Sequence, residues 1–333
     1  MHPVALLHFT VLWLAVKIAA TPSLSLLPRN GQVPVIAQDF PDPDILQDES
    51  SLKWYAYATN ENNKINVQVA TAPSLSGPWN VLSIDALPTV GAWSTGKNVW
   101  APSVRRVADG SYVLYYAAEA ASDSSRHCIG TATSSQITGP FTPLSTPLAC
   151  PLSQGGAIDP AGFTDTDGTN YVVYKIDGNS IGHGGSCGNT VSPIVSTPLM
   201  LQKLASNGVT AIGNPVQVLD RGDADGPLIE APFLLRTAGG VYILFFSSNC
   251  YDSKYYDISY ATASSVLGPY TKSSAPLLQT PDYGLLAPGG VAATPDGKQI
   301  IFHAYCGGSG GNPTGPRCMY ERNLQISCSM LST

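Results

Sequence analysis

Three carboxylates, Asp42, Asp159 and Glu230, stand in short proline-bearing segments of a chain that is poor in charge. Charged residues make up only 12% of the 333 residues, so three carboxylates in similar settings call for a common explanation. Cleavage of a glycosidic bond needs a carboxyl that protonates the leaving oxygen and a carboxylate that acts from the other face of the sugar. A third carboxylate can raise the pKa of the acid by like-charge repulsion. This set of residues therefore fits glycoside hydrolysis.

Each carboxylate by itself also has a structural explanation. Aspartate is common in turns that contain proline, so Asp42 and Asp159 could both cap turns. Glu230 is harder to explain in this way, because glutamate between isoleucine and Ala-Pro is not a favoured turn residue. Asp44 has no counterpart in the other segments, and we expect it to be structural.

Five short apolar strands recur along the chain at intervals of roughly 60 residues, each after a turn. They begin at Trp54, Tyr112, Tyr171, Tyr242 and Ile300. Four of the turns are Asp-Gly or Gly-Gly pairs, which favour hairpins. A repeat of this length has room for four strands, and 32 glycines and 27 prolines suit a turn-rich chain. The pattern predicts an all-β protein, a five-bladed β-propeller that fills residues 21–333 as a single domain. An irregular β-sandwich is the alternative.

The same repeat predicts where the carboxylates lie. Counting back twelve residues from each strand start leads to Asp42, Trp100, Asp159, Glu230 and Pro288. If the blades are equivalent, these residues occupy matching places around the central channel, and three of the five places carry a carboxylate. The neighbouring prolines restrict the backbone and favour a rigid site.

Four segments, in this order, resemble glycoside hydrolase family 43: Phe40-Pro41-Asp42-Pro43, Trp100-Ala101-Pro102, Ile158-Asp159-Pro160 and Ile229-Glu230-Ala231-Pro232. The resemblance covers nearly the whole chain after its first twenty residues. It implies a five-bladed propeller and an inverting mechanism in which Asp42 is the general base and Glu230 the general acid. Asp159 would take the role that modulates the pKa of the acid and orients it. Family members mostly act on α-L-arabinofuranosyl or β-D-xylosyl linkages.

The resemblance also implies an arginine late in the last blade that contacts the sugar, and Arg317 is the best match. Trp100 is a candidate wall for stacking on the apolar face of a sugar. Phe40, His183 and Tyr251 complete the expected sugar contacts; the last two stand in loops that we expect above the ring.

We prefer an exo-acting α-L-arabinofuranosidase or β-xylosidase that acts on plant cell-wall polysaccharide. The alternatives are an endo-α-1,5-L-arabinanase and a non-catalytic carbohydrate-binding propeller.

No metal ion or other cofactor is expected. Many members of the family have Gly-Pro-Gly-His in the last blade, where the histidine holds a central metal ion. Here the segment is Ala287-Pro288-Gly289-Gly290, with glycine in place of histidine. The Asp-rich turn at 165–168 lacks the remaining ligands of an EF-hand.

The first twenty residues are predicted to be a signal peptide, which makes the protein secreted and extracellular. A membrane anchor is the alternative, although the apolar run is shorter than the roughly 20 residues that span a bilayer. Export permits disulfides. The sequence does not fix their pairing; we favour Cys128–Cys150, Cys187–Cys250 and Cys306–Cys318, with Cys328 free.

The charge distribution excludes two classes of partner. The net charge is −6, and no basic run is present, so binding to nucleic acid or to an anionic membrane is not expected. A neutral polysaccharide or oligosaccharide is a compatible partner, and we expect the protein to be a monomer.

Overall fold

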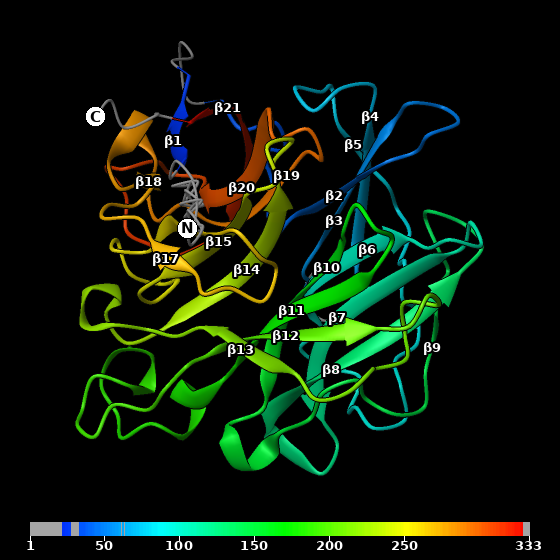
Figure 1. Cartoon of the computed structure of the whole chain (residues 1–333), viewed down its shortest axis with the longest axis horizontal. Helices are drawn as coiled ribbons and strands as arrows, with labels where there is room; N and C mark the ends of the chain where they lie inside the picture. Colours follow the sequence, from blue (N-terminus) through cyan, green and yellow to red (C-terminus); the bar gives the residue numbers. More distant parts are fainter. Residues whose placement is uncertain (1–21, 28–32, 61, 63, 329–333) are drawn as a thin grey trace, which may run out of the picture.

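Five antiparallel sheets surround a common centre, which confirms the predicted five-bladed β-propeller (Figure 1). This computed structural model describes residues 22–27, 33–60, 62 and 64–328. The expected signal peptide and the side chain of Cys328 lie outside the described residues. No helix in the described part of the chain is long and apolar enough to cross a membrane.

In each of the first four blades, four strands follow one another in chain order from the centre outwards and pair antiparallel. Blade 1 contains β2 (Asp44–Gln47), β3 (Trp54–Ala58), β4 (Gln68–Ala72) and β5 (Asn80–Val81). Blade 2 contains β6 (Trp100–Arg106), β7 (Tyr112–Ala120), β8 (Asp123–Ser134) and β9 (Thr142–Pro143). Blade 3 contains β10 (Ala157–Thr164), β11 (Asn170–Ile176), β12 (Leu199–Leu204) and β13 (Val216–Leu219). Blade 4 contains β14 (Ile229–Arg236), β15 (Tyr242–Ser248), β16 (Asp257–Ala263), β17 (Thr271–Lys272) and the short β18 (Leu278–Gln279), which also pairs with β16.

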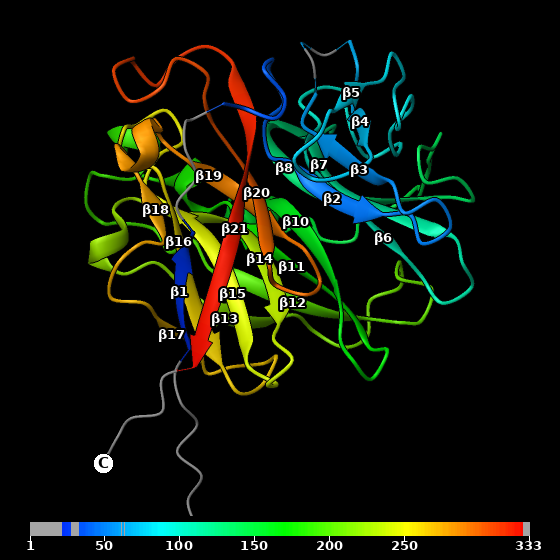
Figure 2. The same ribbon diagram turned by 90° about the horizontal axis from the view of Figure 1, so that it is seen from above.

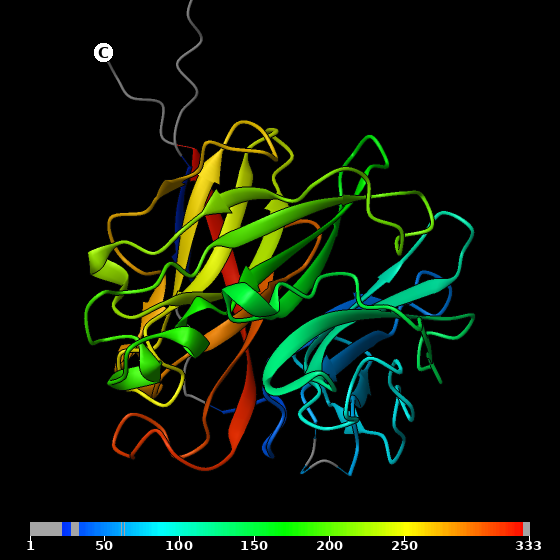
Figure 3. The same cartoon turned by 90° about the horizontal axis from the view of Figure 1, so that it is seen from below.

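The fifth blade is built from both ends of the described chain. Its strands are β19 (Gly289–Ala293), β20 (Gln299–Tyr305), β21 (Arg317–Cys328) and β1 (Pro22–Leu26). Strand β1 pairs antiparallel with β21, in a register that places Leu24 opposite Ile326. Figures 2 and 3 show this closure as a blue strand beside the long red one. The first strand therefore completes the last blade and closes the ring.

The apolar strands predicted from the repeat form the second strand of every blade. Strands β3, β7 and β15 begin at the predicted residue, and β11 and β20 begin one residue earlier. In the turn before β7, Gly110 has φ of 87°, a left-handed conformation that glycine adopts without a steric cost. The turn chemistry and the buried strand were therefore both readable from the sequence.

The blades pack face to face through apolar side chains. Between blades 1 and 2, Tyr57 and Val69 meet Val104 and Leu114, and all four are completely buried. Strands covered on both faces read as continuous apolar runs, as these second strands do. Each such side chain contributes roughly 1.5–3 kcal/mol by leaving water. This packing fixes the loops at the start of each blade, which carry the candidate site.

In the part of the chain that the structure describes, five short 3-10 helices lie in the connections: η1 (Leu152–Gln154), η2 (Gly178–Ile181), η3 (Ser186–Gly188), η4 (Asp223–Asp225) and η5 (Asp282–Gly284). Helices η2 and η3 both belong to the loop between β11 and β12.

Candidate active site

Five residues at the start of the innermost strands share a left-handed backbone and form what we call the ring. Their φ angles are 53° for Asp42, 44° for Ala101, 56° for Asp159, 49° for Ala231 and 59° for Gly290. Each of them, with the two residues that follow it, lines a narrow channel of about 40 Å³ on the propeller axis. Such angles are uncommon in residues other than glycine and concentrate at functional sites.

The prediction that Trp100, Glu230 and Pro288 occupy ring positions is wrong. The ring residues are Ala101, Ala231 and Gly290, so a fixed count of twelve misses them by one or two residues. The hairpins between the first two strands differ in length, and the register shifts at the start of the first strand in several blades. Two of the three carboxylates, Asp42 and Asp159, belong to the ring, whereas Glu230 and Trp100 each stand one residue before it.

Side chains from one blade accept hydrogen bonds from ring amides of the next. The backbone N–H of Asp42 donates to His303 Nδ1 (3.0 Å), and that of Ala101 donates to Thr59 Oγ1 (2.9 Å). The N–H of Ala231 donates to Asp159 Oδ2 (2.9 Å), and that of Gly290 donates to Ser247 Oγ (3.1 Å). These contacts connect blade 5 to 1, 1 to 2, 3 to 4 and 4 to 5. They hold the ring carboxylates in place through the neighbouring blade.

Beside the ring opens a cleft of about 440 Å³, a size typical of sites for small ligands. All three predicted catalytic carboxyls line it, together with Trp100 and Arg317. The remaining side chains of the lining are Thr59, Ala101, Ile158, Lys175, Asp177, Asn179, Cys187, Leu228, Ala231, Tyr251 and Tyr256. The fold thus brings together residues from all five blades.

One side of the cleft, which we call the base half, keeps Asp42 ionised. It consists of Asp42, Thr59, His303 and Arg317. The Thr59 hydroxyl donates to Asp42 Oδ2 at 2.6 Å, and Arg317 Nη1 lies 3.2 Å from Oδ1. Burial raises the pKa of Asp42, but the charge of Arg317, the neighbouring His303 and these hydrogen bonds outweigh it, and the net pKa lies below the usual value.

His303 supports Asp42 without adding charge. Its ring is completely buried, and Nδ1 accepts the hydrogen bond from the Asp42 amide. Burial, and then the positive charge of Arg317, lowers the pKa of His303 to about 3. The imidazole is therefore neutral at physiological pH, and Arg317 is the cation that faces Asp42.

The opposite side, which we call the acid half, consists of Asp159, Lys175, Asp177, Glu230 and Tyr256. The Tyr256 hydroxyl donates to Glu230 Oε1 at 2.9 Å, and Lys175 Nζ lies 3.0 Å from Oε2. Lys175 also pairs with Asp177 Oδ1 at 3.0 Å. Both oxygens of Glu230 therefore face a donor.

Asp159 holds a proton beside Glu230. Burial, and then the charge of Glu230, raises the pKa of Asp159 to about 8, although Lys175 acts in the other direction. Two carboxylates crowded into one site cannot both ionise readily. Below about pH 8, this pair therefore carries at least one proton that can serve an acid.

Three of the predicted sugar contacts, Trp100, Arg317 and Tyr251, form walls of the cleft. Trp100 stacks on His127, with 3.8 Å between ring centroids and 20° between planes. The guanidinium of Arg317 lies 5.2 Å from the ring centroid of Tyr251, a cation–π contact. Tyr251 follows Cys250, and the predicted disulfide between Cys250 and Cys187 is confirmed. That disulfide joins loops of blades 3 and 4 at the edge of the cleft.

Two other predicted contacts lie outside the cleft. Phe40 is completely buried in the main apolar cluster, and only its backbone N–H reaches Arg317, whose carbonyl oxygen lies at 2.8 Å. His183 is exposed, and its Nδ1 lies 2.7 Å from the carbonyl oxygen of Pro193. Neither side chain lines the cleft. Closeness in sequence placed Phe40 beside Asp42, but its side chain points into the core.

Sequence reasoning missed Lys175, Asp177 and Tyr256. Lys175 had a signal, because it is the one charged residue in the apolar strand β11. Tyr256 had none, since the sequence contains 16 tyrosines and nothing distinguishes this one. Asp44, expected to be structural, forms a buried ion pair with Arg105 at 2.7 Å, and this prediction is confirmed.

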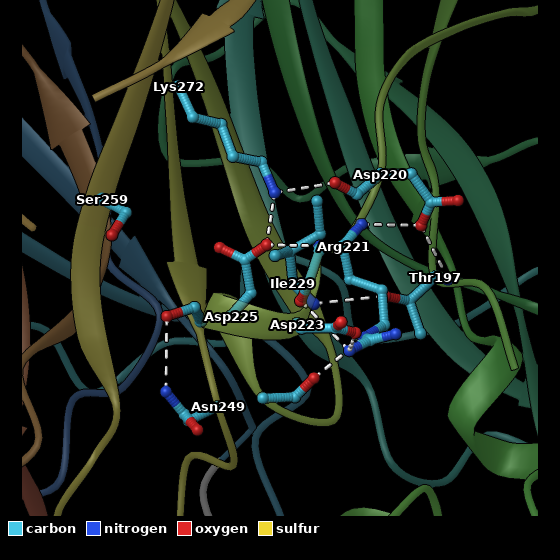
Figure 4. A network of polar contacts seen from close by, with 12 residues as sticks. Thr197, Asp220, Arg221, Asp223, Asp225, Ile229, Asn249, Ser259 and Lys272 are labelled. Carbon is cyan, nitrogen blue, oxygen red and sulfur yellow. Dashed lines mark hydrogen bonds and ion pairs between the residues drawn. The ribbon is translucent and has the colours of Figure 1, made fainter. Parts of the chain in front are cut away.

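A polar network holds the segment that leads into blade 4 and the loop after β15 (Figure 4). The backbone N–H of Asn249 donates to the carbonyl oxygen of Asp225 at 3.0 Å, and the Asp225 carboxylate pairs with Lys272. The backbone N–H of Ile229 donates to Thr197 Oγ1 at 3.1 Å. The network therefore fixes both the start of the Tyr251 loop and the residue before Glu230.

The residues at the centre do not fit a metal ion. Gly290 has no side chain, and a Cβ added there would lie 2.8 Å from the His303 ring. Nδ1 of His303 already accepts a hydrogen bond, and its Nε2 lies 3.5 Å from Arg317 Nη1. A guanidinium thus occupies the place where a cation would meet both His303 and Asp42. Among the described residues, the group Cys187, Cys250 and Asp252 also lies close together, but its two sulfurs form a disulfide.

The predicted disulfides Cys128–Cys150 and Cys306–Cys318 are confirmed as well. The first lies beside His127, which backs Trp100. The second joins β21, next to Arg317, to the end of β20. All three disulfides therefore lie next to residues that form or back the cleft.

Residues 32–326 match the sequence model of the family described as Glycosyl hydrolases family 43. The chain is similar to the β-D-galactofuranosidase xynD of Aspergillus niger, with 26% identity over 67% of this chain but only 60% of that relative. It is also similar to the probable arabinan endo-1,5-α-L-arabinosidase C of Aspergillus flavus, with 28% identity over 79% of this chain and 81% of the relative. Among solved structures, a thermostable family-43 glycoside hydrolase superposes with a TM-score of 0.71 and 26% identity, over 93% of this chain and 97% of that one.

Proposed function

We propose that this chain, which belongs to glycosyl hydrolases family 43 and thus hydrolyses glycosidic bonds, is an exo-acting α-L-arabinofuranosidase or β-xylosidase. It inverts the configuration of the sugar and acts outside the cell on plant cell-wall polysaccharide. The three disulfides support secretion, because disulfides persist in oxidising compartments.

The reaction divides between the two halves of the cleft. Asp42 takes a proton from a water molecule, whose oxygen attacks the anomeric carbon. Glu230 gives the proton that it shares with Asp159 to the leaving oxygen on the other side, so the glycosidic bond breaks as an O–H bond forms. Asp42 ends protonated and the Asp159–Glu230 pair ends without its proton, and exchange with solvent restores both. An inverting enzyme needs this opposed acid and base with room for water between them.

The observation that carries this proposal is the contrast in protonation across one cleft. Arg317 holds the pKa of Asp42 low, while burial and Glu230 raise the pKa of Asp159 to about 8. A base that is ionised and an acid site that keeps a proton can coexist at neutral pH. A carbohydrate-binding module has no need of this arrangement.

The edge of the cleft favours release of single sugars from a chain end. The disulfide Cys187–Cys250 joins two loops there, and Tyr251 packs against Arg317. A fixed wall limits how a polymer can pass through. The similarity to an endo-arabinosidase over 79% of the chain keeps endo action as the second candidate.

Hydrolysis of a panel of glycosides tests the proposal. It contains aryl α-L-arabinofuranosides, aryl β-D-xylosides, an aryl β-D-galactofuranoside, arabinan and arabinoxylan, and NMR reads the anomeric form of the first product. We expect single pentoses of inverted configuration. Oligosaccharides released from arabinan would support endo action instead. Absence of hydrolysis with retained binding would support the binding-module alternative, and Asp42→Asn serves as the inactive control.

A further inference from the structure

A completely buried lysine lies beside the residue to which we assign the acid role. Lys175 on β11 contacts Glu230 Oε2 and Asp177 Oδ1, each at 3.0 Å. Burial lowers the pKa of Lys175, but the charges of Asp177, Glu230 and Asp159 outweigh it and hold the pKa above the usual value. The ammonium is therefore charged, and a buried charge persists only with such compensation.

The position of Lys175 recurs in other blades. In the strand register, Lys175 pairs with Ile158, Ser247 with Glu230 and His303 with Gly289. Ser247 and His303 each accept a hydrogen bond from a ring amide of the next blade. Lys175 also reaches the next blade, but it contacts the carboxylate of Glu230 rather than a backbone amide. The fold thus places a side chain at this position in several blades, and in blade 3 the side chain is a lysine that brings a positive charge next to Glu230.

We propose that Lys175, held by Asp177, is a positioning residue that sets how tightly Asp159 and Glu230 retain their proton. It also stabilises the carboxylate that Glu230 becomes after it protonates the leaving oxygen. This inference rests on the acid role proposed for Glu230.

The charge that develops in the reaction appears where Lys175 points. As the proton leaves Glu230 for the glycosidic oxygen, one negative charge forms on its two oxygens. Lys175 faces one of these oxygens and Tyr256 the other, so both contacts strengthen as the charge forms. Asp177 weakens the field of Lys175 and thereby keeps the acid from losing its proton too early.

Other titratable groups face the pair. Asp42, paired with Arg317, acts on Asp159 across the cleft. His127 stands near Asp177, and burial lowers its pKa, so it adds little charge at neutral pH. Neither His127 nor Arg317 contacts Glu230, which leaves Lys175 as the cation with the strongest influence on the acid.

Two substitutions of opposite sign test this role. Lys175→Met keeps an unbranched side chain, one atom shorter, and removes its charge, so the pair should lose its proton at higher pH. Asp177→Asn leaves the charge of Lys175 less compensated, so the pair should lose its proton at lower pH. We expect the basic limb of the kcat/KM profile to move by about one to three pH units, upwards in the first variant and downwards in the second. A purely structural contact would not move the limb in opposite directions.

Leaving-group dependence and a matched control complete the kinetic test. Lys175→Met should reduce turnover of alkyl arabinofuranosides by about 10- to 100-fold, and that of aryl arabinofuranosides with good leaving groups much less, because they need little proton donation. Lys298→Met removes another lysine–aspartate contact, with Asp296 at 3.3 Å, and neither residue lines the cleft or belongs to the network behind Glu230. This control should leave the pH profile in place.

An infrared titration of the carboxylic-acid C=O band gives a readout that does not need activity. The band assigned to the pair by its loss in Asp159→Asn should disappear near pH 8 in the wild type, at higher pH in Lys175→Met and at lower pH in Asp177→Asn. No shift, or shifts in one direction for both variants, would overturn the inference. If the wild type hydrolyses no glycoside, the proposed function fails, while this titration still decides the role of Lys175 in holding the proton.

Discussion

Asp42 and Asp159 occupy equivalent positions on the ring and share the same left-handed backbone, with φ of 53° and 56°. Their surroundings differ in charge. Asp42 faces the guanidinium of Arg317, and its pKa falls, whereas Asp159 faces the carboxylate of Glu230, and its pKa rises to about 8. One fold position thus yields two chemical states.

The difference originates in the side chains that neighbouring strands contribute. Blade 5 supplies Arg317 and the neutral His303 to the base half. Blade 4 supplies Glu230 to the acid half, and blade 3 supplies Lys175. The backbone arrangement repeats from blade to blade, but the neighbouring side chains differ. Those side chains decide whether a ring carboxylate is ionised or keeps a proton. If this explanation is right, changes in those side chains should alter one half and leave the other intact.

The largest effect is expected from Glu230→Gln, which removes the acid and leaves the base half unchanged. Turnover of glycosides with poor leaving groups should fall by about 10²- to 10⁴-fold, the usual contribution of general acid catalysis. Circular dichroism and the melting temperature should remain close to those of the wild type. Glu119→Gln is the matched control, because Glu119 is a buried glutamate bound to Thr95 and Asn98 outside the cleft. Near-normal activity of Glu230→Gln would refute the acid role.

A smaller effect is expected from Arg317→Met, which removes the cation of the base half. The pKa of Asp42 should rise, because burial then acts without the opposing charge. The base must be ionised to act. The acidic limb of the kcat/KM profile, where activity falls as pH decreases, should therefore move to a pH about one to three units higher. The kcat/KM profile measures this limb, and the basic limb should stay in place. Arg105→Met breaks the Arg105–Asp44 pair outside the cleft and should lower stability without moving either limb.

The smallest effect concerns stability. The folded pKa of Asp159 is about 8, above the ordinary value of 3.8, so from about pH 4 to 8 the folded state keeps a proton that the unfolded chain loses. Stability therefore falls as pH rises through this window, by an amount on the order of a few kcal/mol. Asp159→Asn removes this penalty, and its amide oxygen can still accept the Ala231 N–H.

Thermal unfolding of the wild type and Asp159→Asn at pH 4.5 and 8.5 measures this difference. We expect nearly equal melting temperatures at pH 4.5 and a variant that is about 3 °C more stable at pH 8.5. Asp257, whose pKa burial raises to about 6, contributes equally to both proteins. A variant that is less stable at both pH values would contradict the picture of a crowded acid half.

The sequence by itself determined the propeller, because a repeat of strand and turn signals depends on local chemistry. It also identified the three carboxylates and Arg317, with help from the resemblance to a family, and it allowed the disulfide pairing that the structure confirms. These features need only residue type and approximate spacing.

Only the tertiary structure decided which residues form the ring and which face the cleft. A bulge, or a hairpin that is one residue longer, changes which residue of a strand faces the channel, so a fixed count placed Glu230 on the ring. Phe40 was expected in the site because it is close to Asp42 in the sequence, but its side chain is buried in the core. Contacts between blades, such as Lys175 with Glu230 and His303 with Asp42, join residues 55 and 261 positions apart. No local pattern encodes these pairs, because they arise from the closure of the whole ring.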